Sequence, residues 1–278
     1  MSQELFKSVF LKLNRAQTHI NDISSILKTS LEEKKIEFTT RISEDKLGYE
    51  VYTNNFLYDN ILEDLGVRVG EVMHNLRSAL DNLVFISALK VKNPPLKPKK
   101  IYFPIFDEEQ EFYAKTKDIF NQIPEEVKER IISVQPFTQQ KNNPEFKNEL
   151  YILSVLQWLN NTDKHQTPKV LLAILDRIGM EGHFEFDNGE WEHFIDEKQG
   201  FYKFFPVAPD SKVFEFRTTE IITKMNMRFQ LKIEFLLEVF ETSMNIDILQ
   251  TIQQNILFLV IDYLSDLGIN IEFKNPEG

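Results

Sequence analysis

Cysteine is absent from this chain of 278 residues, and glycine is scarce. Without thiols the chain can form neither a disulfide framework nor a zinc site built on thiolates, and the absence fits a reducing compartment. The nine glycines form neither a phosphate-binding loop nor the G-x-S-x-G turn of a serine hydrolase. The sequence therefore lacks the familiar motifs of nucleotide-binding proteins and of hydrolases with a serine or cysteine nucleophile.

Long hydrophobic runs are also absent. No apolar run is longer than that at residues 256–261, which is far short of the roughly 20 apolar residues that cross a bilayer. Residues 1–5 lack the charged and apolar regions of a signal peptide. We therefore expect a cytoplasmic protein with no membrane partner.

Positive charge is in the minority, because the formal net charge is −11. That balance argues against non-specific coating of nucleic acid, which needs a basic surface, but it leaves room for a small local site. The one basic run lies in a proline-rich stretch and contains Lys90, Lys92, Lys97, Lys99 and Lys100. We interpret this stretch as a solvated linker, because its prolines stop regular structure.

The first half of the chain has the apolar spacing of helices. Apolar residues recur at every third or fourth place, and they predict helices at residues 2–31, 60–90, 108–121, 124–133 and 145–161. Alternating apolar and polar residues predict a hairpin at 36–53. We expect a loop at 135–144, and a loop or short edge strand at 103–106.

The second half is richer in strand patterns. Residues 225–239 alternate between apolar and polar side chains, which predicts the buried and wet faces of an antiparallel sheet. Further patterns predict extended segments at 169–176 and 182–186, a turn at 187–189, a helix at about 246–266 and a terminal strand at 269–273.

These patterns together predict an α+β fold. It would consist of an N-terminal helical bundle with an inserted β-hairpin, followed by an antiparallel sheet and a C-terminal helix. We expect residues 1–168 to be mainly helical, with the hairpin at 36–53, and residues 169–278 to hold the sheet and the last helix. The two regions would pack as one compact unit.

Two polar clusters interrupt the apolar helices and are the candidate sites. They cover residues 74–82 and residues 160–165. On a helix, 100° per residue places one stripe through Gly70, His74, Arg77 and Asp81. Gly70 would let another element approach closely. Because polar groups removed from water need partners, we expect Arg77 or Asp81 to bond to residues 163–165 across two packed helices.

The residues of the two clusters predict two kinds of role. Candidate catalytic residues can move a proton or stabilise negative charge: Arg77, Asp81, His165, His74 and Lys164. The rest would form a polar network: Asn75, Asn82, Asn161 and Asp163. The structural alternatives are a solvated i,i+4 pair in the first cluster and a helix C-cap in the second. We expect no cofactor and no metal ion, because the His and Asp residues lack metal-ligand spacing.

The order of the polar motifs resembles that of a large family of uncharacterised bacterial proteins. The motifs are HNLRSALD at 74–81, FPI at 103–105, QPF at 135–137 and NTDKH at 161–165. In that family the residue after the Asp is commonly His, which makes the first motif similar to the R-x(4–6)-H motif of HEPN domains. The resemblance implies a helical bundle with metal-independent RNase activity in defence or toxin systems. It also implies RNA as a partner and a homodimer in which the motif faces its copy.

This chain departs from the HEPN motif at the His position. Arg77 matches the Arg, whereas the His position holds Asn82, and an amide cannot act as a general acid or base near neutral pH. In an RNase, His165 or His74 would move the 2′-hydroxyl proton. Arg77 and Lys164 would then stabilise the phosphorane charge.

Three alternatives to an active RNase stay open. The first is an inactive relative that binds without cleaving. The second is a non-catalytic protein-interaction module, in which the polar residues form a buried network that fixes helix packing. The third is a small-ligand binder that uses the Phe-rich sheet as a pocket wall.

Overall fold

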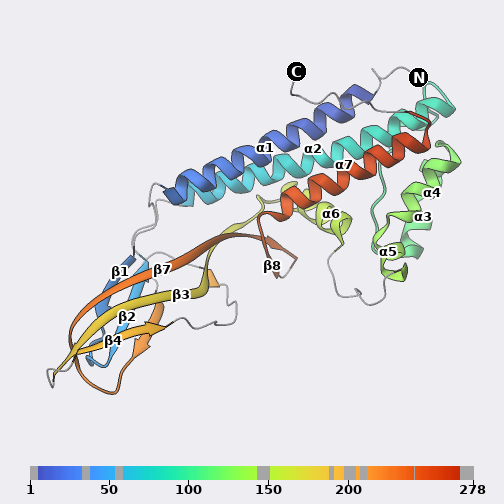
Figure 1. The fold of residues 1–278 in the computed structure, drawn as a ribbon. Coiled ribbons are helices and arrows are strands. Elements are labelled where there is room, and N and C mark those ends of the chain that lie inside the picture. The colour runs from blue at the N-terminus through green and yellow to red at the C-terminus, as the bar shows by residue number, and fades with distance from the viewer. Residues whose placement is uncertain are drawn as a thin grey trace. The chain divides into compact units, whose positions relative to one another are not determined.

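The structure, a computed structural model, describes residues 6–32, 38–53, 59–142, 151–187, 191–196, 205–206, 212–240 and 242–269. It confirms the predicted α+β fold (Figure 1). The helices are α1 (Lys7–Glu32), α2 (Asp59–Val91), α3 (Glu109–Phe120), α4 (Glu125–Ser133), α5 (Pro136–Asn142), α6 (Ile152–Asp163) and α7 (Ile248–Asp266), with a 3-10 turn, η2 (Pro98–Lys100). No described helix is both long enough and apolar enough to cross a bilayer.

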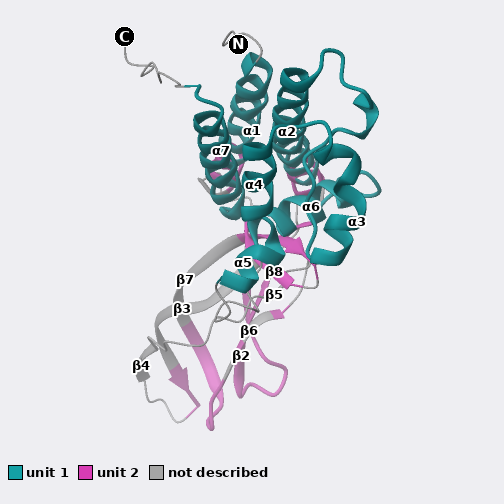
Figure 2. Cartoon of the chain, turned by 90° about the vertical axis from the view of Figure 1, so that its right-hand side faces the viewer, with its two compact units in different colours: residues 1–23, 66–168, 247–278 teal, residues 24–65, 169–246 magenta. Residues whose placement is uncertain are grey.

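The chain divides into two compact units, each assembled from separate segments (Figure 2). The helical unit consists of Met1–Ile23, Gly66–Pro168 and Asp247–Gly278, and the sheet unit consists of Ser24–Leu65 and Lys169–Ile246. Pro168 ends one segment of the helical unit, whereas the predicted hairpin at 36–53 belongs to the sheet unit. The predicted division of the chain at residue 168 stays a prediction. The expected packing of both regions into one compact body stays a prediction.

The core of the helical unit is built on α2, whose apolar stripe follows the predicted three- and four-residue spacing. The buried members of this stripe within the helical unit include Val69, Val72, Leu76, Leu80 and Leu83. Helix α1 lies beside α2, where His19 Nδ1 is 3.1 Å from Glu71 Oε2. On α7, the buried Tyr263 hydroxyl donates to Ser87 Oγ of α2 over 2.9 Å. These contacts place α1 and α7 against α2, and each of the three helices has buried apolar side chains.

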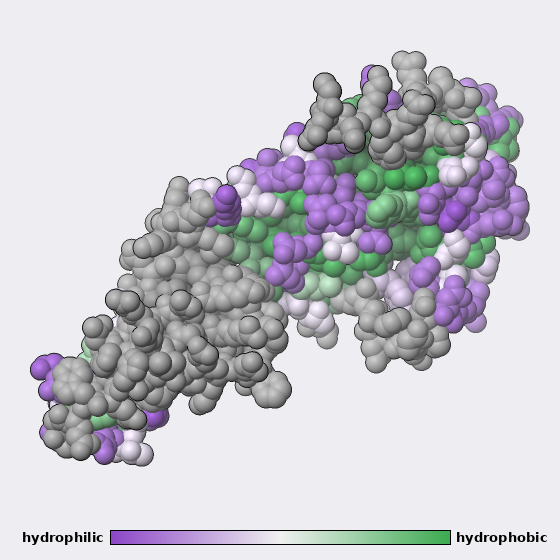
Figure 3. Space-filling model, viewed as in Figure 1, coloured by the Kyte–Doolittle hydropathy of each residue, from purple (hydrophilic) through white to green (hydrophobic). Residues whose placement is uncertain are grey.

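Some apolar surface of the helical unit remains exposed. The face in Figure 3 shows apolar patches bordered by hydrophilic side chains. The exposed large apolar residues of α1 and α7 are Leu11 and Phe258.

The described residues of the sheet unit form two antiparallel sheets. The predicted hairpin is confirmed as β1 (Phe38–Ile42) and β2 (Gly48–Thr53), and β6 (Lys212–Arg217) pairs with the other edge of β2. The larger sheet has the order β4-β3-β7-β8, from β4 (Trp191–Asp196), β3 (Val170–Phe186), β7 (Ile222–Val239) and β8 (Thr242–Asn245); β5 (Phe205–Pro206) also pairs with β3. Strand β7 confirms the predicted strand at 225–239.

Strand β3 and helix α5 differ from the sequence predictions. The two predicted extended segments at 169–176 and 182–186 are one strand, with a register shift between Leu175 and Ile178. The predicted loop at 135–144 is wrong in its first part, because Pro136–Asn142 form α5. Proline suits the first position of a helix. The backbone carbonyl of Gln135 accepts hydrogen bonds from the N–H groups of Thr138 and Gln139 in the first turn.

Several predictions fall partly outside the described residues, including the first residues of the helix predicted at 2–31 and of the hairpin predicted at 36–53. Residues 143–150, 188–190 and 270–278 are not described. They include the start of the helix predicted at 145–161, most of the turn at 187–189 and all but the first residue of the strand at 269–273. Within the described residues, the helices predicted at 60–90, 108–121 and 124–133 are confirmed as α2, α3 and α4.

Candidate functional site

Arg77 and Asp81, one turn apart on α2, hold the backbone of Phe103 from both sides. Arg77 Nη2 donates to the Phe103 carbonyl, and the Phe103 N–H donates to Asp81 Oδ1 over 2.8 Å. Arg77 Nη2 also lies 3.3 Å from Asp81 Oδ1. Arg77 Nη1 donates to Gln157 Oε1 of α6 over 3.2 Å. We call this arrangement the Phe103 clamp; it joins α2, α6 and the segment before α3.

The clamp surrounds a largely buried cation. The Arg77 side chain is 12% exposed and the Asp81 side chain 36%. Burial lowers the pKa of the Arg77 guanidinium, and the nearby Asp81 carboxylate and Tyr102 oppose that shift. Arginine keeps its charge in proteins, so its desolvation has to be offset by Asp81 and by the Phe103 carbonyl. The geometry is that of a structural ion pair.

The backbone of residues 101–106 is irregular and partly buried, so its polar groups need partners. The buried Gln135 side chain supplies hydrogen-bond partners for two backbone groups of this segment. Its Nε2 donates to the Pro104 carbonyl over 2.9 Å, and its Oε1 accepts the Phe106 N–H over 3.1 Å. Three of the four sequence motifs therefore meet in one network, through Arg77 and Asp81, through Phe103 and through Gln135.

The second polar cluster meets α2 at a different place, beside two glycines. A Cβ atom on Gly70 would lie 1.9 Å from Asp163 Oδ1, and one on Gly66 would lie 2.3 Å from the Pro168 carbonyl oxygen. The predicted close approach at Gly70 is therefore present. Because glycine has no Cβ, the chain after α6 can lie directly against α2.

The remaining candidate residues do not converge on Arg77. His74, Lys164 and His165 are exposed. Lys164 Nζ lies 3.3 Å from Asn161 Oδ1, and the His165 N–H donates to the Thr162 carbonyl over 2.9 Å. These are the contacts of a helix end, which is the structural alternative for this cluster.

The amide residues of the two clusters are also separate. Asn75 Nδ2 donates to the Glu71 carbonyl within α2 over 2.7 Å, and Asn82 is half-buried. Within the described chain, no hydrogen bond or ion pair joins Arg77 or Asp81 to residues 163–165, unlike the sequence expectation. The described residues also contain no group of three His, Asp or Glu side chains placed to hold a metal ion.

The two glycines provide a direct test of the close packing beside α2. Replacing Gly66 with alanine should destabilise the protein by roughly 1–3 kcal/mol, because the new Cβ would overlap a backbone carbonyl. The gain of about 1 kcal/mol in helix propensity would offset only part of that loss. Gly70→Ala should cost less, because its obstacle is the end of the exposed Asp163 side chain. Urea denaturation measures both effects.

The double variant Gly70→Ala/Asp163→Ala serves as the control. It removes the obstacle while keeping the new methyl group, so it should be at least as stable as Asp163→Ala alone. If Gly66→Ala were as stable as the unmodified protein, the Pro168 carbonyl would not be held against α2.

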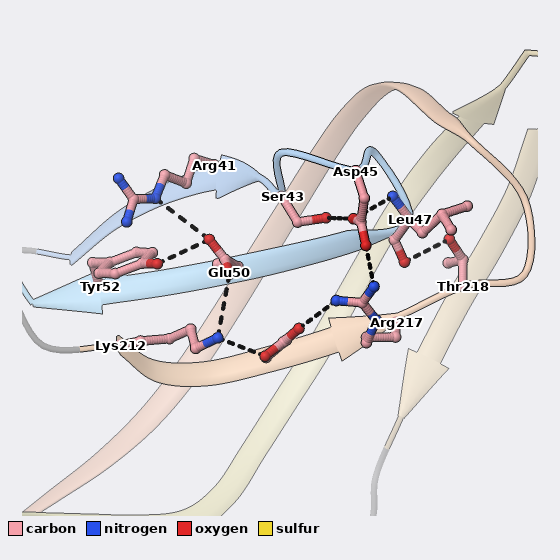
Figure 4. A network of polar contacts seen from close by, with 10 residues as sticks. Arg41, Ser43, Asp45, Leu47, Glu50, Tyr52, Lys212, Arg217 and Thr218 are labelled. Atoms are coloured by element: carbon pink, nitrogen blue, oxygen red, sulfur yellow. Dashed lines mark hydrogen bonds and ion pairs between the residues drawn. The ribbon is translucent and has the colours of Figure 1, made fainter.

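The sheet unit holds a second polar network, which sequence reasoning missed (Figure 4). Cations and carboxylates alternate across β1, β2 and β6. The guanidinium of Arg41 lies 3.6 Å from the centre of the Tyr52 ring and its Nε 3.5 Å from Glu50 Oε2. Lys212 Nζ bridges Glu50 and Glu215, at 3.3 and 2.6 Å. Arg217 then links Glu215 to Asp45 in the β1–β2 turn.

The hydrogen bonds of this network keep its carboxylates ionised. The Ser43 hydroxyl, the Leu47 N–H and Arg217 lower the pKa of Asp45 to about 2. The Tyr52 hydroxyl is the main cause of the lowered pKa of Glu50. Lys212 and Arg217 lower the pKa of Glu215. Each carboxylate therefore holds its charge at a lower pH than a free side chain.

A pocket of about 450 Å³ lies beside this network. It is lined by Arg41, Ile42, Ser43, Glu44, Asp45, Glu50, Tyr52 and Arg217. The volume would accept a small molecule. However, the charges that face the pocket bond mainly to one another, so the network holds three strands together and shows no preference for a ligand of either sign.

Comparisons of the chain with protein-family models, with curated proteins and with solved structures find no match. The roles of the candidate residues are therefore inferred from their geometry. Of the arrangements that the candidate residues form, the Phe103 clamp has the most specific hydrogen bonds.

Proposed function

We propose that this protein is a non-catalytic interaction module, in which Arg77 and Asp81 are structural. One observation carries the proposal: the largely buried Arg77 guanidinium is directed at the Phe103 carbonyl, Gln157 and Asp81. A residue that stabilises charge in a transition state must direct its donors at the reacting atoms. The two terminal nitrogens of Arg77 are instead directed at groups of the protein itself.

The positions of the histidines give further support. A general base must reach the proton that it removes, directly or through one water. His165 lies at the exposed end of α6, with its backbone N–H bonded to Thr162, and His74 is exposed on α2. Neither imidazole is hydrogen-bonded to Arg77 within the described residues. Asn82, at the HEPN His position, cannot transfer a proton near neutral pH. An inactive relative of such RNases is therefore the form of the HEPN hypothesis that fits best.

An RNA-cleavage assay tests the proposal. We expect the purified protein to leave a labelled RNA intact, with and without a chelator, and Asn82→His to confer no cleavage. The reason is that the new imidazole would still have no neighbouring side chain directed at a phosphate, because Arg77 bonds to groups of the protein. Circular dichroism should confirm that each variant is folded, and a known RNase serves as positive control.

The opposite result would be equally clear. RNA cleavage that His165→Ala abolishes, with an unchanged unfolding temperature, would overturn the non-catalytic assignment. It would instead support the metal-independent mechanism that the resemblance implies, provided that chelator has no effect.

A further inference from the structure

The lysine loop, defined as residues 90–100, is a basic segment in an acidic protein. The whole chain has a net charge of −11, yet residues 90–106 include no Asp or Glu. Its five lysines are all exposed: Lys90, Lys92, Lys97, Lys99 and Lys100. Such a local excess of positive charge concentrates anions at one place on a surface that otherwise repels them.

The loop is held in place at several points. At its start, the Lys92 N–H donates to the Ala88 carbonyl over 3.0 Å. In the middle, the Lys97 N–H donates to the buried Gln122 side chain over 2.7 Å. Just beyond its end, the Phe103 clamp fixes both the N–H and the carbonyl of one residue. The sequence interpretation as a solvated linker therefore describes the exposed side chains but not the backbone, which is ordered.

Most of the lysine charge in the loop is not neutralised by carboxylates. Lys97 Nζ is 2.7 Å from Asp118 Oδ1. Lys90 Nζ lies 3.4 Å from the Leu267 carbonyl, which carries no net charge. Among the described residues, the other lysines of the loop have no ion pair: Lys92, Lys99 and Lys100. Lys100 is still near enough to Asp118 to contribute to the lowered pKa of that carboxyl, after the larger effect of Lys97. An ordered backbone thus presents ammonium groups that are available to a partner.

We propose that the lysine loop is a contact surface for the phosphate backbone of single-stranded RNA. This inference rests on the proposed function, since it names the partner of the interaction module. An ammonium group binds phosphate as a point charge without demanding one geometry. Each phosphate that is neutralised releases counterions, which favours association. Because the loop is already ordered, binding would not incur the cost of ordering it.

An anionic membrane surface fits the loop less well. Stable attachment to a bilayer needs a second signal besides a basic patch, usually inserted apolar groups. The exposed large apolar side chains of the loop are Val91 and Leu96, at 54% and 67%. Two such groups bury little apolar area. Along an RNA strand, by contrast, phosphates can meet lysines that are spread over the whole length of the loop.

A pair of matched variants tests the inference. The loop variant replaces with glutamine the lysines that form no ion pair within the described residues: Lys90, Lys92, Lys99 and Lys100. The control variant makes the same change at exposed lysines elsewhere, of which the last three pair with carboxylates: Lys7, Lys115, Lys141 and Lys169. Each removes four positive charges, so the two variants have the same net charge. The probe is a fluorescent oligouridine of about 20 nucleotides, and the readout is fluorescence anisotropy between about 50 and 200 mM salt.

We expect the unmodified protein to lose affinity as salt rises, with a logarithmic slope of roughly −0.7 for each phosphate contacted. Four contacts would give a slope of about −3. The loop variant should bind at least about 100-fold more weakly at low salt, with a slope near zero, while the control variant keeps most of the slope. The double variant Lys99→Gln/Lys100→Gln, which changes only η2, should lower the slope by about half.

Four outcomes would overturn the inference. They are no RNA binding by the unmodified protein at low salt, equal losses in the loop and control variants, unchanged binding by the loop variant, and capture by anionic phosphatidylserine vesicles in place of RNA. None of these would restore a catalytic role to Arg77. Conversely, His165-dependent cleavage would overturn the proposed function while the loop variant still reported on RNA contact.

Discussion

Replacing Arg77 with alanine is expected to lower the free energy of unfolding by roughly 3 kcal/mol. Removing one member of a buried pair typically costs about 3–5 kcal/mol, because the other charge is left without compensation. Asp81 is about one-third exposed, so water can partly replace the lost guanidinium and the lower end of that range applies. The Phe103 carbonyl would also lose its donor, which adds to the cost.

Chemical denaturation measures this loss, and two further variants make it specific. Arg15→Ala changes an exposed arginine of α1 and should alter stability by less than about 0.5 kcal/mol. Arg77→Lys keeps the charge but cannot serve Phe103, Gln157 and Asp81 together, so its effect should be intermediate. If Arg77→Ala cost less than about 1 kcal/mol, the Phe103 clamp would not be structural.

The coupling of Arg77 with Asp81 can be measured separately. In a double-mutant cycle, the variant with both residues replaced by Ala should lose less stability than the sum of the two single variants. When both side chains are removed, neither charge is left without its partner. Additive losses would mean that the two side chains act independently on Phe103.

The clamp also links the two proposals. It fixes the peptide that follows the lysine loop, so weakening it should loosen the backbone on which Lys99 and Lys100 are carried. Arg77 would then influence partner binding without touching the partner. That is a positioning role, and it differs from catalysis in leaving any bound RNA intact.

The sequence predicted the elements of the fold well where periodicity is strong. The leucine spacing of α2 and the alternation of β7 each extend over many residues, so their type could be assigned without tertiary information. The predicted loop at 135–144 failed because α5 is short and polar. Its helical start depends on Pro136 and on the Gln135 carbonyl, which no apolar pattern reports.

The candidate site was predicted only in part. Polar residues on the stripe of α2 indicated that Arg77 and Asp81 needed partners, and Gly70 indicated a close approach. Their actual partners are Phe103 and Gln157, tens of residues away in sequence, and periodicity contains no information about such pairings. The prediction that residues 163–165 would be the partners of Arg77 or Asp81 is therefore wrong.

The network of the sheet unit could not have been predicted for a similar reason. Period-two spacing places Glu50 and Tyr52 on the same face of β2. The cross-strand partner of Glu50 is Glu215 of β6, and this pairing depends on a strand that lies far along the chain. Two adjacent carboxylates would repel each other without Lys212. The role of Lys212 is therefore clear only once the pairing of β2 with β6 is known.

Replacing Leu76 or Leu80 with alanine is expected to lower the free energy of unfolding by roughly 2–5 kcal/mol. Both side chains are 0% exposed and lie on the apolar stripe of α2. The loss has two parts, namely the transfer of the removed methyl groups and the cavity that a closely packed core cannot fill by relaxing. Urea denaturation, with the midpoint and the slope fitted separately, measures it.

Leu11→Ala is the matched control, because it makes the same chemical change at a helical leucine that is 58% exposed. It should alter stability by less than about 0.5 kcal/mol, since no cavity forms at the surface. Losses below about 1 kcal/mol for both Leu76→Ala and Leu80→Ala would place the stripe outside the core. Because Leu76 immediately precedes Arg77, a normal loss at Leu76 combined with a negligible one at Arg77 would separate the two roles of α2. The helix would then be needed for the core but not for the Phe103 clamp.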